Sequence, residues 1–111
     1  ERYQHFLDTL KQLQEHLKAD VNRKQLNVIF SQLQQEFEEE IMSLTGEELT
    51  GEILPRWQSS QTEVHRMMRL LQNDMMFLQT SRNSNTSQHR LTTVRDRVGK
   101  LIDFADALTK E

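Results

Sequence analysis

The sequence predicts an all-α protein, an up-and-down bundle of about four amphipathic helices that forms a single domain over residues 1–111. Two observations carry this prediction. Apolar residues recur every three or four positions in four separate series, which is the spacing of one face of an α-helix. The chain of 111 residues also holds only 3 Gly and 1 Pro, and no segment alternates with the period of a strand.

The N-terminal series predicts the first helix. Its apolar positions, with Gln, Lys, Glu, Asp and His between them, are Tyr3, Phe6, Leu7, Leu10, Leu13 and Leu17. The series lapses over residues 19–22, where Asn22 followed by Gln25 resembles a helix N-cap with its N3 partner. A second helix is therefore expected to start there. A helix continuous through this segment stays open as an alternative, because no Gly or Pro interrupts it.

The second helix is expected to end near Thr45 and Gly46, where Gly would supply the left-handed residue beyond the C-terminus. Its apolar positions have an average spacing of about 3.6, which describes a straight helix; they are Leu26, Phe30, Leu33, Phe37, Ile41 and Leu44, with Ile29 beside them. Residues 45–52 contain two of the glycines and are expected to form a connector.

The third helix is expected to begin around Pro55, since proline suits the first turn of a helix. Its stripe consists of Trp57, Val64, Met68, Leu71, Met75 and Leu78. Further apolar residues lie outside the centre of this stripe, namely Met67, Leu70, Met76 and Phe77. A helix that is apolar around so much of its circumference is expected either at the centre of the bundle or at a surface between subunits.

The methionines of this helix favour a homodimer. Two adjacent pairs, Met67–Met68 and Met75–Met76, cannot both face one stripe, so one member of each pair is expected to point sideways toward a partner. The apolar content of 35% also leaves a four-helix monomer with a thin core.

A polar cluster over residues 81–87 predicts a turn or helix junction before the last helix. The final apolar series has heptad-like spacing suited to near-parallel or antiparallel packing; its members are Leu91, Val94, Val98, Leu101, Ala105 and Leu108.

Composition bounds the environment and the chemistry. The chain has no Cys, which excludes disulfides, thiolate metal sites and cysteine nucleophiles. It has no run of apolar residues long enough to cross a membrane and no basic-then-apolar opening, so we expect a cytoplasmic protein without a membrane partner. Glycine-rich nucleotide loops and nucleophile elbows are missing. We therefore expect no catalytic site, no cofactor and no small-molecule substrate.

The four histidines do not match a metal-binding pattern. The residues three positions before His5, His16, His65 and His89 are not carboxylates, so the Glu-x-x-His motif of di-iron bundles is absent. No metal site is expected. A histidine phosphotransfer bundle that uses His16 or His65 remains an alternative function, and a plain helical dimerisation or adaptor module is another.

Charge is distributed unevenly along the chain. The net charge of −3 combines an acidic segment over residues 1–52, with a net charge of −6, and a basic segment over residues 56–100, with a net charge of +5. Nucleic acid is not expected as a partner, because the pI is about 5.8 and the glutamates of residues 36–40 would repel phosphate.

The basic segment predicts a protein-binding surface, because arginine presents a planar fork to carboxylates. Arg66 and Arg69 lie three positions apart and share one flank of a helix. On the last helix, Arg90, Arg97 and Phe104 recur every seven positions along one edge. The expected surface, with its apolar neighbours, consists of Arg66, Arg69, Met76, Arg90, Arg97 and Phe104. The alternative is that these arginines pair internally with the acidic N-terminal half and fix the docking of the two helix hairpins.

A family resemblance spans nearly the whole chain. Residues 57–71, Asp74, residues 77–78 and the segment 82–90 resemble the PatD family of cyanobacterial proteins, which control heterocyst frequency. Residues 3–7 and 26–35 are similar as well. The resemblance implies a cytoplasmic, non-enzymatic protein that limits how many cells become heterocysts. It further implies binding to the tubulin-like division protein FtsZ, with promotion of filament assembly and bundling.

Overall fold

The structure, a computed structural model, describes residues 2–18, 22–42, 53–81 and 83–109. These residues form helices and contain no strand; the elements are α1 (Arg2–His16), α2 (Arg23–Glu36), the π-helix η1 (Phe37–Ile41), α3 (Ile53–Thr80) and α4 (Ser84–Thr109). The prediction of an all-α bundle of four helices is confirmed.

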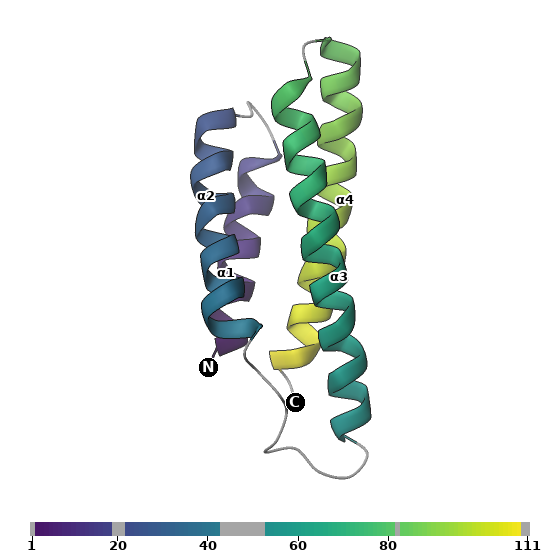
Figure 1. Cartoon of the computed structure of the whole chain (residues 1–111). Helices are drawn as coiled ribbons and strands as arrows, with labels where there is room; N and C mark the ends of the chain where they lie inside the picture. Colours follow the sequence, from purple (N-terminus) through teal and green to yellow (C-terminus); the bar gives the residue numbers. More distant parts are fainter. Residues whose placement is uncertain (1, 19–21, 43–52, 82, 110–111) are drawn as a thin grey trace.

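The helices form two antiparallel hairpins, as Figure 1 shows, so that the chain runs up, down, up and down. The α3–α4 hairpin is the longer one, with helices of 28 and 26 residues against 15 in α1 and 14 in α2. Helix α4 packs against both α3 and α1, and α1 also packs against α2. Among the described elements, α3 has α4 as its one extensive neighbour, so α3 is not the central helix of the bundle.

The core consists of the four predicted apolar stripes, which meet between the helices. Of the stripe residues that the structure describes, all are buried except Phe30, which is partly buried against the core. Leu44 lies outside the described residues. One expectation is wrong for the first methionine pair, because Met67 and Met68 are both buried, whereas in the second pair Met75 is buried and Met76 is exposed. None of the described helices is long and apolar enough to cross a membrane.

Local sequence sets where the helices begin. The Oδ1 atom of Asn22 accepts hydrogen bonds from the backbone N–H groups of Lys24 and Gln25, at 3.0 and 3.2 Å, which confirms the predicted N-cap of α2. Pro55 lies in the first turn of α3, as predicted. Asn83 caps α4 in the same way as Asn22, since its Oδ1 accepts from the N–H groups of Asn85 and Thr86. The predicted junction over residues 81–87 is therefore short, and its second half is already helical.

The end of the second helix differs from the expectation of a straight α-helix. Residues 37–41 form a π turn, in which the Met42 N–H donates to the Phe37 carbonyl at 2.9 Å. Both Phe37 and Ile41 remain buried in this turn. The Ile41 carbonyl accepts a hydrogen bond from Nε2 of Gln61 on α3, at 3.0 Å, so α3 satisfies a backbone group at the end of the turn. The predicted helix end at Thr45 and Gly46 lies outside the described residues.

The two hairpins are joined by the apolar core and by hydrogen bonds to backbone and side-chain atoms. Arg95 Nε donates to the Leu17 carbonyl at 2.7 Å and thereby caps the C-terminal end of α1. Arg23 reaches from α2 to the start of α4, where its guanidinium donates to Ser87 Oγ at 2.9 Å. None of the described arginines between residues 56 and 100 pairs with a carboxylate of residues 2–42. The alternative of docking through arginine–glutamate pairs is therefore wrong for the described residues.

Candidate partner-binding surface

Two exposed apolar side chains stand next to each other near the C-terminal end of α3. Met76 is 53% exposed and Phe77 is 48% exposed. The other large hydrophobic residues that are exposed in the described chain are Val28, within α2, and Met42, directly after η1, 14 positions apart. Adjacent exposed apolar residues on one helix are typical of a surface that a partner covers.

An arginine of α4 lies against this apolar pair. The guanidinium carbon of Arg90 is 4.7 Å from the centroid of the Phe77 ring, within the range of a cation–π interaction. Arg90 makes no ion pair with a described carboxylate. The contact holds the guanidinium beside the apolar pair while its charge remains uncompensated.

A second arginine without an ion pair among the described residues lies on α3 itself. Arg69 is exposed and precedes Met76 by seven positions, so the two side chains lie on one face of the helix, about 10 Å apart along its axis. We refer to Arg69, Met76, Phe77 and Arg90 as the α3–α4 patch. Its positive charges are balanced by no described carboxylate.

The other two predicted arginines are each compensated. Arg66 makes an exposed ion pair with Glu63, one turn earlier on α3, with Nη2 at 2.9 Å from Oε2. Arg97 Nε lies 2.9 Å from Oδ2 of Asp74, and this pair is largely enclosed between α3 and α4. Both guanidinium groups therefore hold a carboxylate already.

Phe104, the last predicted member, is half-buried and packs against the core. The contact between Arg97 and Asp74 shows the antiparallel register of α3 and α4, in which Phe104 lies at the level of Met67. Of the predicted surface, Arg69 and Met76 thus lie on one face of α3 and Arg90 lies over the neighbouring Phe77, whereas Arg97 and Phe104 make inner contacts. Phe77 was not among the predicted surface residues, although it lies outside the apolar stripe of its helix in the same way as Met76.

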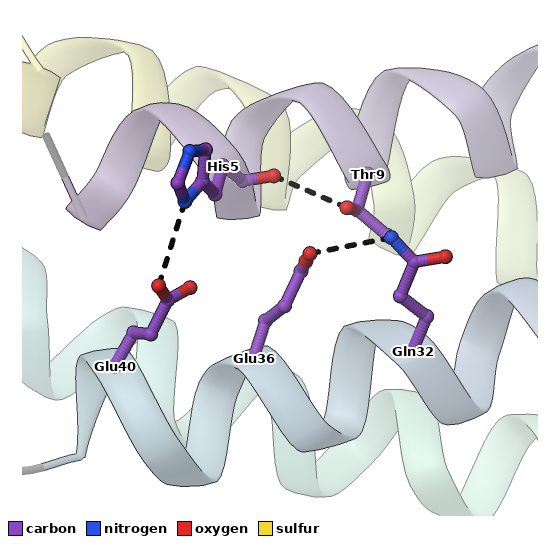
Figure 2. Close-up of polar contacts among 5 residues, drawn as sticks. All are labelled: His5, Thr9, Gln32, Glu36 and Glu40. Atoms are coloured by element: carbon purple, nitrogen blue, oxygen red, sulfur yellow. Dashed lines mark hydrogen bonds and ion pairs between the residues drawn. The ribbon is translucent and has the colours of Figure 1, made fainter.

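Polar side chains of α1 and of the α2–η1 segment face one another, as Figure 2 shows. His5 Nδ1 lies 3.4 Å from Glu40 Oε1, and Thr9 Oγ1 donates to the His5 carbonyl at 3.1 Å. Gln32 Nε2 donates to Glu36 Oε2 at 3.3 Å. These side chains include one histidine and two carboxylates, but no three His, Asp or Glu residues of the described chain are grouped so that they could hold a metal ion.

Two further histidines, His16 and His65, lie on α1 and α3. His16 is exposed at the end of α1, with Nδ1 at 2.9 Å from the Gln12 carbonyl oxygen. His65 is half-buried, and its ring lies edge-on to Phe37 with centroids 5.1 Å apart. Burial lowers the pKa of His65, and the positive charge of Arg69 lowers it further. His65 is therefore held in its neutral form over a wider pH range than a free histidine.

Comparisons of the chain with protein-family models, with curated proteins and with solved structures found no match.

Proposed function

We propose that the protein is a non-enzymatic regulator of heterocyst differentiation frequency, which binds the cell-division protein FtsZ in the cytoplasm and modulates the assembly of its filaments. The resemblance to the PatD family supplies the partner. The structural observation that supports a protein-binding role is the α3–α4 patch, in which Met76 and Phe77 are exposed side by side and Arg90 lies over the Phe77 ring.

The composition of the patch suits a protein interface. Aromatic residues, Met and Arg are enriched where proteins bind one another, whereas Lys and Glu are depleted there. An apolar pair flanked by uncompensated arginines attracts an acidic partner, speeds the encounter and makes the binding sensitive to salt.

Filament bundling adds a requirement, since a bundling protein must offer at least two binding surfaces. We propose that a homodimer supplies them, because a two-fold symmetric dimer presents each surface twice. Light scattering at tens of micromolar tests this part of the proposal. A mass of 13.2 kDa, that of a single chain, would contradict the dimer.

The experiment that tests the function is co-sedimentation with FtsZ polymerised by GTP, at low and at moderate salt. At low salt we expect the protein in the pellet together with an increased amount of FtsZ polymer. At moderate salt we expect much less of the protein in the pellet and little additional polymer. The absence of the protein from the pellet at both salt concentrations would contradict FtsZ as the partner.

A further inference from the structure

We infer that the α3–α4 patch docks an acidic segment of a partner protein, whose carboxylates bind Arg69 and Arg90 and whose apolar side chains cover Met76 and Phe77. This inference rests on the proposed function only in taking a protein as the ligand. It adds the location of the surface and the chemistry of the segment that binds there.

The first observation that supports this docking site is the distribution of charge on α3 and α4. Arg66 and Arg97, on the same two helices, are neutralised by Glu63 and Asp74. Arg69 and Arg90 have no ion pair with a described residue. The apolar pair therefore has uncompensated positive charge beside it on both helices, and this charge complements carboxylates.

The stacked arginine is the second observation. The guanidinium of Arg90 lies 4.7 Å from the centroid of the Phe77 ring, and none of the described polar atoms accepts a hydrogen bond from it. A stacked guanidinium keeps the N–H donors along its edge available for a carboxylate. Because the ring contact already restricts the side chain, less conformational entropy is lost when the carboxylate binds.

The apolar pair is the third observation. Met76 and Phe77 lie on neighbouring positions of one helix and are each about half exposed. Two such side chains offer a small contact area, which suits a single docked segment rather than an extended interface. Methionine adapts to irregular partner surfaces, and aromatic residues frequently supply most of the energy of an interface.

These features favour an acidic segment over a nucleic acid. A phosphate backbone is bound by many cations along a track, whereas the patch offers two arginines. The patch also belongs to a chain whose net charge is −3. Phosphate groups, moreover, would make no use of the apolar pair.

The test is a titration of the full chain into a fluorescent peptide, followed by anisotropy. The probe is an amphipathic peptide of about four helical turns, with Leu and Phe on one face and Glu along both flanks. One control peptide replaces Glu by Gln, and a second replaces Leu and Phe by Ser. We expect each control peptide to bind at least about tenfold more weakly than the probe, because each lacks one of the two contacts.

Protein variants locate the binding. Arg69→Glu and Phe77→Ser should each raise the dissociation constant of the probe at least about tenfold. Arg56→Glu is the matched control, because Arg56 is exposed on the first turns of α3, far from the patch, and its reversal alters the net charge equally. It should change the constant less than about twofold. Circular dichroism shows whether each variant is folded, and Met76→Gln replaces Phe77→Ser if the latter unfolds.

Several results would overturn the inference. Equal binding of the acidic peptide without apolar residues, or of a single-stranded RNA in its place, would show a plain polyanion site. Equal weakening by Arg56→Glu would show a diffuse charge effect. Unchanged binding in Arg69→Glu and Phe77→Ser would place the segment elsewhere. A dimer that these two variants convert to a monomer in light scattering would show that a second copy of the chain covers the patch.

The same variants in FtsZ co-sedimentation separate this inference from the proposed function. If FtsZ retains the unmodified protein and both patch variants equally, the inference fails and the proposed function stands. If the peptide binds at the patch but FtsZ retains nothing, the partner is wrong and the chemistry of the patch stands.

Discussion

Arg97 and Asp74 form an ion pair that connects the C-terminal part of α3 to the middle of α4, with 2.9 Å between Nε and Oδ2. The two side chains are 22% and 12% exposed, so solvent screens this pair less than an ion pair on the surface. Arg66 and Glu63 make an ion pair of the same length within α3, but with side chains that are 56% and 34% exposed. The two pairs therefore allow a direct comparison of an enclosed and an exposed arginine.

Arg97→Ala is expected to lower the free energy of unfolding by about 2 kcal/mol, because it leaves the carboxylate of Asp74 enclosed and unpaired. Arg66→Ala should leave the midpoint of denaturant unfolding nearly unchanged. Urea unfolding monitored by circular dichroism measures both. The double variant Asp74→Leu with Arg97→Met should recover much of the loss, since no unpaired charge remains. Equal shifts of the urea midpoint in Arg97→Ala and Arg66→Ala would contradict the distinction between an enclosed and an exposed ion pair.

Tyr3→Phe is expected to leave the free energy of unfolding unchanged or to raise it by about 1 kcal/mol. The Tyr3 hydroxyl is buried with no hydrogen-bond partner in the part of the chain that the structure describes, whereas its ring packs edge-on against Phe6 with centroids 6.2 Å apart. The substitution keeps the ring contact and removes an unsatisfied polar group. Tyr3→Ala, which removes the ring as well, should lower the free energy of unfolding by about 3 kcal/mol.

Tyr3→Phe is also expected to change how the stability of the protein depends on pH in the alkaline range. Burial raises the pKa of the Tyr3 phenol well above its usual range, so the unfolded chain ionises first as the pH rises through about 10. The contribution of Tyr3 to stability is thus present below this pH and is lost above it. Tyr3→Phe should remove this part of the alkaline decline in the unfolding midpoint. A decline of equal steepness in both proteins would contradict the assignment to Tyr3.

His65 is expected to titrate below the ordinary histidine value of about 6.5, because burial and the charge of Arg69 both disfavour its protonated form. Between the lowered pKa and about 6.5 the unfolded chain binds more protons than the folded one, so stability falls as the pH decreases through this window. NMR titration of the imidazole measures the pKa directly.

Arg69→Gln is the matched variant for this titration. It removes the charge but not the burial, so the pKa of His65 should rise part of the way toward its ordinary value. Arg56→Gln, on the same helix but outside the patch, should leave the titration unchanged. An identical pKa in the Arg69→Gln variant and the original protein would show that burial alone lowers it.

Part of the fold could be predicted because the signals are local. The stripe positions became the core, and Asn22 and Pro55 mark helix starts, since a cap and a first-turn proline act within one turn of the chain. The π turn over residues 37–41 could not be predicted. Its apolar positions fit the spacing of a straight helix, and the Gln61 side chain that binds the Ile41 carbonyl comes from a different helix.

The candidate surface was predictable only in its broad location. The charge distribution indicated the basic half of the chain, and the spacing of Glu63 and Arg66 on one helix already allowed their ion pair. The partner of Arg97, in contrast, depends on the register between α3 and α4. Similarly, nothing in the two methionine pairs distinguishes buried Met67 from exposed Met76.

The sequence by itself determined that the chain forms helices, where most of them begin and which side of each is apolar, because these properties depend on residues within a turn or two of one another. The tertiary structure decided which arginines are neutralised and which apolar side chains remain exposed. These outcomes depend on neighbours contributed by other helices: α4 brings Arg97 to Asp74 and Arg90 to Phe77, while no described helix covers Met76.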